Sequence, residues 1–199
     1  MTTTVGEDME LVVRMSRYMI EHKLPYKVEF IPDPLCWTEA PESKQILGRQ
    51  RNRWTRGTIE TLWAHRKMLF NPKFGVLGLL SFPYWFFFEF LAPIIEFLGI
   101  IWLFVAAALG IVNWPFFVVV SLFIYCFVFM INMFAILAEE KTYYQYKEYT
   151  DIIKLVGSAL LEPLIYHPFL VWSAMKGHYD YWRGNNSWGE MTRKGMKTT

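Results

Sequence analysis

The sequence has few of the features of a disulfide-stabilised, secreted or metal-binding protein. Its two cysteines, Cys36 in a polar stretch and Cys126 deep in apolar sequence, predict no disulfide and a reducing, cytoplasmic setting for the polar part. The N-terminus, residues 1–4, is not followed by a basic region and an apolar core, so we predict no signal peptide. The histidines show no ligand spacing with any Cys, Asp or Glu, so we predict no metal site.

A large excess of charge is also missing, since the formal net charge is only +2. The basic residues are nevertheless unevenly placed, and seven of them crowd residues 49–73, just before the apolar part of the chain, as is usual for a cytoplasmic flank. A basic cluster beside a membrane segment requires no other partner, so we predict membrane lipid as a partner and no nucleic acid. The cluster comprises Arg49, Arg51, Arg53, Arg56, Arg66, Lys67 and Lys73.

What the sequence has in abundance is apolar side chains. It is 54% hydrophobic and 19% aromatic, which is too apolar for a water-soluble fold and indicates a membrane protein. Residues 97–138 carry no charge, and at about 1.5 Å per residue they can cross a hydrocarbon core of roughly 30 Å twice. We place transmembrane helices at about 91–111 and 115–138, with the turn at Asn113 to Pro115.

Residues 74–90 are expected to form an interfacial helix or an oblique lead-in that breaks at Pro83. Glu89 and Glu96 lie seven positions apart and therefore share a helix face. Either they line a polar path or pair with an arginine, or Glu89 lies at the headgroups and Glu96 faces a neighbouring helix. Both interpretations stay open.

The apolar stretch at 152–175 contains charged residues and two prolines, and a single crossing there would place the basic tail outside. We therefore expect residues 139–175 to be a cytoplasmic linker and an interfacial or re-entrant helix. Residues 176–199 are expected to be a basic cytoplasmic tail. Both termini would then be cytoplasmic, and we expect an integral protein of the plasma (inner) membrane.

The polar segment, residues 1–73, has the pattern of a small piece of an α/β domain. Helical periodicity predicts a helix at 7–21, alternation predicts a strand at 26–30, and a second helix is expected at 43–70 with Gly57 as its weak point. One strand and these helices cannot bury one another adequately. The strand would need a sheet that this chain does not contain.

Gln50, Arg53 and Trp54 fall on one face of the second predicted helix. They offer an amide, a fixed cation and a flat aromatic surface, which suit a sugar hydroxyl, a diphosphate and the apolar face of a pyranose. The alternative is a basic helix beside the membrane whose tryptophan anchors it at the interface. These residues alone favour neither.

The chain carries Glu-Asp-x-x-Leu at 7–11, Thr38-Glu39-Ala40-Pro41, Gln-x-x-Arg-Trp at 50–54 and then membrane spans. With its motifs in this order, the chain resembles the membrane-embedded family-2 glycosyltransferases. These include the cellulose, hyaluronan, chitin and poly-N-acetylglucosamine synthases. Residues 187–193 are similar to the Trp-Gly-Thr-Arg motif of the hyaluronan and chitin branch, but Glu190-Met191 stands where that motif has threonine directly after glycine.

The resemblance implies an inverting sugar transfer from a nucleotide-diphosphate donor to a polysaccharide or lipid-linked acceptor. Asp8 would correspond to the catalytic base, with Gly6 where the family has threonine. The resemblance implies substrate-binding roles for Glu7, Gln50, Arg53, Trp54, Trp188 and Arg193. The complete enzyme would use Mg²⁺ or Mn²⁺ with a UDP-sugar. The expected fold is a mostly α membrane protein, with the remnant of a cytoplasmic α/β glycosyltransferase domain followed by two transmembrane helices and interfacial helices.

The family's nucleotide-binding strands and Asp-x-Asp motif lie upstream of the Glu-Asp motif, and these 199 residues contain no Asp-x-Asp. We therefore expect the chain to be the C-terminal part of such an enzyme, inactive alone and in need of a chain that supplies the nucleotide-binding half. The alternative is a non-catalytic scaffold or assembly subunit of a polysaccharide synthase. A small transporter or channel would leave the Gln-x-x-Arg-Trp face unexplained.

Overall fold

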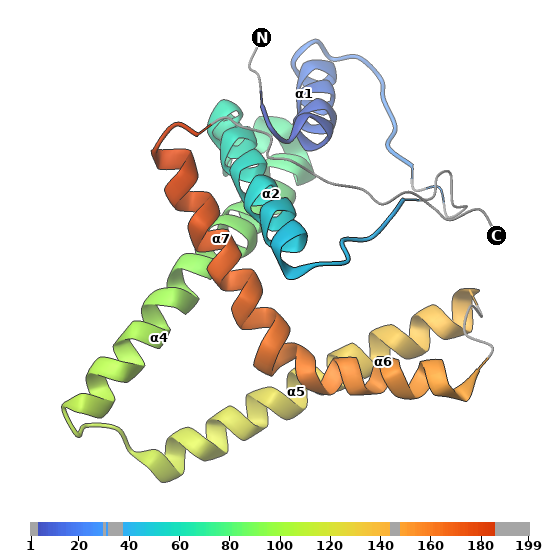
Figure 1. The fold of residues 1–199 in the computed structure, drawn as a ribbon. Helices are drawn as coiled ribbons and strands as arrows, with labels where there is room; N and C mark the ends of the chain where they lie inside the picture. The colour runs from blue at the N-terminus through green and yellow to red at the C-terminus, as the bar shows by residue number, and fades with distance from the viewer. Residues whose placement is uncertain (1–3, 30, 32–37, 144–147, 186–199) are drawn as a thin grey trace. The chain divides into compact units, whose positions relative to one another are not determined.

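The computed structural model describes residues 4–29, 31, 38–143 and 148–185, and the chain divides into two compact units. The first comprises Met1–Glu96 and Trp172–Thr199, and the second comprises Phe97–Val171. Every regular element in the described residues is a helix (Figure 1). The mostly helical architecture expected from the sequence is confirmed.

The first unit begins with two helices, α1 (Glu7–Glu21) and α2 (Lys44–Ala64). Ser43 begins α2 as its N-cap, because its side-chain oxygen accepts a hydrogen bond from the backbone N–H of Ile46 at 3.2 Å. Two short 3₁₀ turns follow, Arg66–Met68 and Pro72–Phe74. The helix predicted at 7–21 is confirmed.

The predicted strand does not form in the part that the structure describes. Residues 26–29 are exposed and have no regular structure, and residue 30 lies outside the described residues. The physical reason is the one that the sequence already raised, since a lone strand has no neighbour to receive its backbone hydrogen bonds. The α/β character expected of residues 1–73 is not confirmed.

The second helix is shorter than predicted, because α2 ends at Ala64 and not near residue 70. Phe70 has a φ of 53°, and its backbone N–H donates to the carbonyl of Gly78 at 3.1 Å, which turns the chain back on itself. A Cβ on Gly78 would lie 2.4 Å from the carbonyl oxygen of Asn71. Only glycine fits this turn without displacing the backbone.

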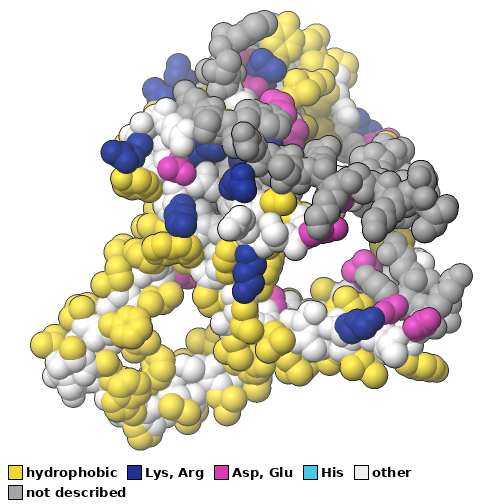
Figure 2. All heavy atoms as spheres, in the orientation of Figure 1, with side chains coloured by type: hydrophobic (Ala, Val, Ile, Leu, Met, Phe, Trp, Pro, Cys, Tyr) yellow, Lys and Arg dark blue, Asp and Glu magenta, His cyan; other side chains and the backbone are white. Residues whose placement is uncertain are grey.

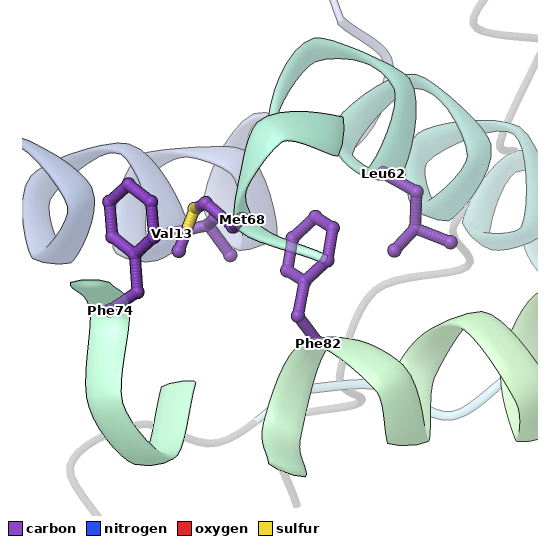
Figure 3. Close-up of a cluster of buried hydrophobic side chains, with 5 residues drawn as sticks. All are labelled: Val13, Leu62, Met68, Phe74 and Phe82. Carbon is purple, nitrogen blue, oxygen red and sulfur yellow. The ribbon is translucent and has the colours of Figure 1, made fainter. Parts of the chain in front are cut away.

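A small hydrophobic core holds α1 and α2 against the chain that follows them. Figure 3 shows its side chains converging between the helices, and Met68, at 0% exposure, is the most buried. The core meets α1 at Val13, in the middle of the helix, with Ile20 packed against it, and it therefore fixes the helix that carries Asp8. Its members are Val13, Leu62, Met68, Phe74 and Phe82.

A buried polar link joins α1 to the end of α2. His65 Nε2 lies 3.2 Å from Glu10 Oε1, and His65 Nδ1 lies 3.3 Å from Arg17 Nη1. A neutral imidazole with its proton on Nε2 would donate to the Glu10 carboxylate and accept from the guanidinium, so both ring nitrogens are satisfied. Glu10 and His65 are 6% and 5% exposed, and this link fixes the direction of α1 along α2.

The helix that begins at Leu77 continues to Ala108. It combines π-helical turns at Leu77–Ser81 and Trp85–Leu91 with α3 (Phe82–Tyr84) and α4 (Ala92–Ala108). The break expected at Pro83 does not occur. Wider turns on both sides accommodate the missing proline N–H, so the predicted lead-in and first span form one helix.

The second unit consists of the end of α4, α5 (Trp114–Tyr143), α6 (Tyr149–Leu161), a π-helical turn at Glu162–Tyr166 and the first residues of α7 (His167–Trp182). Hydrogen bonds from Tyr125 and Asn132 join α5 to the chain after it. The Tyr125 hydroxyl donates to the carbonyl of Leu160 at 2.8 Å, and the Asn132 amide donates to the Glu162 carboxylate at 3.4 Å. Glu162 therefore has a polar partner within the apolar unit.

Three helices are long and apolar enough to cross a membrane: Leu77–Ala108, Trp114–Tyr143 and Tyr149–Trp182. In Figure 2, hydrophobic side chains cover α4 and α5 on the face shown. The sequence pattern predicted two transmembrane spans and an interfacial stretch. The prediction of two spans is not confirmed. In the third stretch, a π-helical turn at Glu162–Tyr166 contains Pro163 and continues the helix from α6 into α7.

The core predicts that Met68→Ala destabilises the first unit much more than Met15→Ala. Met68 is fully buried whereas Met15 is 58% exposed on α1. Emptying the Met68 site should lower the free energy of unfolding by about 2–5 kcal/mol. Thermal unfolding of the two variants, followed by circular dichroism in the same detergent, measures the difference. Equal midpoints would contradict the packing described here.

Candidate active site

The candidate site is built on one face of α2. Gln50, Arg53, Trp54 and Gly57 lie at helical spacing within the described helix, so they share a face. Gln50 and Arg53 are half-buried, whereas the indole of Trp54 is 43% exposed. The face therefore presents an accessible aromatic surface next to an amide and a guanidinium.

Arg51 contributes to this face although the sequence pattern did not single it out. Its guanidinium carbon lies 4.6 Å from the centroid of the Trp54 ring, a cation–π contact that restrains the indole. Arg51 was grouped with the basic flank of the membrane segment. Its position three residues before Trp54, one turn along the same helix, is the signal that could have identified it.

The start of α1 meets α2 at the end of this face. A Cβ added to Gly6 would lie 2.8 Å from the Cα of Gly57, and one added to Gly57 would lie 2.8 Å from the Cα of Gly6. Two backbones can approach this closely only where both residues lack a side chain. Gly57 follows Arg53 by four residues, about 6 Å along the helix, so Glu7 and Asp8 begin close to the motif.

Hydrogen bonds hold the chain in place just before this contact. The Glu60 carboxylate accepts from the Thr4 hydroxyl at 2.6 Å and from the backbone N–H of Val5 at 2.9 Å. The Thr4 hydroxyl oxygen in turn accepts from the backbone N–H of Gly6 at 3.2 Å. A single carboxylate of α2 thus fixes the path of the chain into α1.

Asp8 lies in the first turn of α1, together with Glu7 and Glu10. Its carboxylate accepts a hydrogen bond from the backbone N–H of Met9 at 2.8 Å, and the side chain is exposed. Glu7 is exposed too, whereas Glu10 is buried in the link to His65. The three acids therefore differ in availability, and Asp8 and Glu7 are the two that a substrate can reach.

The opposite side of α2 packs on α7. A Cβ on Gly177 would lie 2.8 Å from the Cβ of Thr55 and 2.9 Å from the backbone oxygen of Asn52, so α7 approaches α2 closely at this glycine. The Asn52 amide donates to the Asp180 carboxylate at 2.7 Å and its oxygen accepts from the Arg56 guanidinium at 3.0 Å. These contacts fix the rotation of α2 about its axis, which turns the motif face away from α7.

Two of the predicted substrate-binding residues, Trp188 and Arg193, lie outside the described residues. The structure therefore places Glu7, Asp8, Gln50, Arg53 and Trp54 of the predicted set. Within 4–29, 31, 38–143 and 148–185, no three His, Cys, Asp and Glu side chains gather in a way that could hold a metal ion.

Comparison with known proteins identifies the family. A model of the glycosyl transferase family group 2 matches residues 1–138. The chain belongs to this family, and the resemblance stated from its motifs is confirmed. No solved structure matches the chain.

Curated relatives match a shorter part of the chain. Chitin synthase A of Colletotrichum graminicola is 43% identical over 65 residues, which are 33% of this chain and 3% of that protein. Chitin synthase Vb of Fusarium oxysporum f. sp. lycopersici is 46% identical over 59 residues, 30% of this chain and 3% of that protein. The probable glycosyltransferase YdaM of Bacillus subtilis is 36% identical over 53 residues, 27% of this chain and 11% of that protein. The match thus spans a small part of each relative.

The glycine contact predicts that Gly57→Ala destabilises the protein, although alanine is intrinsically the better helix residue by about 1 kcal/mol. The added methyl group would meet the backbone of Gly6, which cannot move aside as a flexible side chain would. Hydrogen–deuterium exchange at residues 7–11 should therefore increase and the unfolding midpoint should fall.

Gly99→Ala is the matched control, because a Cβ on that helical glycine has no atom within 4 Å. It should leave the unfolding midpoint unchanged or raise it. A rise in stability for Gly57→Ala equal to that for Gly99→Ala would show that the two backbones are not in contact.

Proposed function

We propose that this chain provides the acceptor side of an inverting glycosyl transfer from a nucleotide-diphosphate sugar to a polysaccharide or lipid-linked acceptor. Membership of the glycosyl transferase family supports sugar transfer. The observation that carries the proposal is the contact between Gly6 and Gly57, which brings the start of α1 to the end of the Gln50–Arg53–Trp54 face. A carboxylate, a cation and an aromatic surface then belong to one region.

In the proposed reaction Asp8 is the general base. An acceptor hydroxyl attacks the anomeric carbon of the donor sugar and passes its proton to the Asp8 carboxylate. The bond from the anomeric carbon to the diphosphate oxygen breaks, and the diphosphate leaves with the electron pair. A single displacement of this kind inverts the configuration. Exposure of Asp8 at the start of a helix supports the role, because the carboxylate is accessible to an incoming hydroxyl.

The α2 face would bind the two substrates. Trp54 would form the floor under the terminal sugar of the acceptor, with its ring restrained by Arg51. Arg53 and Gln50 would contact the diphosphate and the donor sugar, since a guanidinium stabilises the charge that develops on the leaving group. We propose further substrate contacts for Glu7, Trp188 and Arg193.

In the complete enzyme this chain would have a partner. We propose that the chain does not turn over a donor by itself and works with a nucleotide-binding part, which would hold a UDP-sugar with Mg²⁺ or Mn²⁺. The described residues contain no cluster that fits such an ion, so the nucleotide-binding part would supply its ligands. The chain would reside in the plasma (inner) membrane with both termini in the cytoplasm. Transfer from any UDP-sugar by the purified chain would contradict its dependence on a partner.

Asp8→Asn is predicted to lower sugar transfer about 100-fold or more, because the amide cannot take the acceptor proton. The assay is incorporation of radiolabelled sugar from UDP-sugars by membranes that contain the complete synthase with this chain as its only copy. Glu21→Gln, at the other end of α1, is the control and should retain full activity. Normal transfer by Asp8→Asn, with normal assembly, would favour a non-catalytic scaffold.

Trp54→Ala is predicted to reduce transfer about tenfold at limiting acceptor, which corresponds to about 1.4 kcal/mol of binding. The loss should appear as a higher KM for the acceptor, and Trp54→Phe should recover part of it because an aromatic surface is restored. Trp63→Ala removes another exposed tryptophan of α2 and serves as the control. An equal loss for Trp63→Ala would remove the special role of Trp54.

A further inference from the structure

An open groove runs between α1 and the beginning of the Leu77–Ala108 helix, within the first unit. It encloses about 470 Å³, a volume in the range of ligand sites. Met9, Val12 and Val13 line it from α1, and Leu77, Phe82 and Trp85 face them. The leading turns of the apolar helix, from Leu77 to Trp85, extend over about 12 Å, so the groove is elongated.

The lining selects an apolar ligand over a sugar. Six of its eight residues are apolar, and only Asp8 and Ser81 bring polar side chains. A glycan would lose hydrogen bonds to water on entering such a groove and recover few of them. An alkyl chain loses none and gains the burial of its methylene groups.

The groove is continuous with a surface suited to a membrane. One wall consists of the first turns of a helix that is long and apolar enough to cross a bilayer. Beside the lining residues, Val76 and Leu80 expose 71% and 67% of their surface, and both side chains are apolar. A lipid tail can therefore enter the groove from the bilayer without passing through water.

Asp8 restricts the head group of that lipid. A carboxylate repels a phosphate and accepts a hydrogen bond from a hydroxyl, so the group that reaches Asp8 should be a neutral hydroxyl. We propose that the groove holds the tail of a neutral lipid acceptor, such as a glycolipid, and delivers its hydroxyl to Asp8. This inference rests on the proposed function, in which Asp8 is the base, and it assigns the acceptor to the lipid class.

Photolabelling tests the groove without any need for turnover. The full chain in phosphatidylcholine vesicles is irradiated with an alkyl glucoside that carries a diazirine in its tail, and labelled peptides are mapped by mass spectrometry. We expect labels on residues 9–13 and 77–85. An unlabelled alkyl glucoside should compete for these sites, whereas an alkyl phosphate of equal chain length should compete far less, because the Asp8 carboxylate repels its head group.

Val12→Trp should fill the groove and reduce this labelling about tenfold, the effect of expelling about two methylene groups. Val12 is 57% exposed, so the variant should fold, and Ser81→Phe provides a second obstruction. Met15→Trp is the matched control, because Met15 is equally exposed on α1 but does not line the groove.

Labelling that is absent, or that survives both Val12→Trp and Ser81→Phe, would overturn the proposal. Equal competition by the alkyl phosphate would also overturn it, because Asp8 would then not select a neutral head group. Failure of the proposed function has a different signature. In that case Asp8→Asn leaves sugar transfer intact while the groove still binds the glucoside and Val12→Trp still blocks it.

Discussion

The backbone contact between Gly6 and Gly57 is the constraint on which the candidate site depends. It works because neither residue has a side chain, so the buried segment just before α1 and the middle of α2 meet at a distance that no other pair of residue types permits. The hydrogen bonds of Glu60 fix the chain on one side of the contact, and the buried link between Glu10 and His65 fixes it on the other. Between these attachments lie the two exposed acids.

The two sides of helix α2 have different roles. One side is fixed by α7 through Gly177 and the hydrogen bonds of Asn52, and the other presents Trp54 beside Arg51. Asp8 borders both the end of that face and the apolar groove along α1. Under the proposed function, this position would let one carboxylate receive a hydroxyl whose sugar rests on the indole and whose tail lies in the groove.

The sequence predicts the local parts of this arrangement and not the contacts between them. Periodicity identified α1, and the spacing of Gln50, Arg53 and Trp54 identified their common face, because both follow from helix geometry alone. Gly57 could be recognised only as a weak point, since its value lies in a neighbour that is 51 positions away, at Gly6. The groove could not be predicted from the sequence either, because its two walls, in α1 and at the start of the Leu77–Ala108 helix, are far apart along the chain.

Two wrong predictions share a cause. The strand at 26–30 was predicted from alternating apolar residues, and the break at Pro83 was predicted from the missing N–H of proline. In both cases the structure of the neighbouring residues, and not the local sequence, determined the conformation. No partner strand is present in the described residues, and π-helical turns absorb the proline. The conformational preferences of the local sequence could not predict the lack of a partner strand in the described residues or the π-helical turns.

The most direct test of the account is a cross-link between the start of α1 and the motif. With Cys36 and Cys126 replaced by serine, Glu7→Cys and Arg53→Cys are treated with a short bifunctional thiol reagent. The account predicts efficient cross-linking for this pair and little for Glu21→Cys with Arg53→Cys, because α1 runs toward His65 and places Glu21 about 20 Å further along. Equal yields for the two pairs, or a higher yield for Glu21, would contradict it.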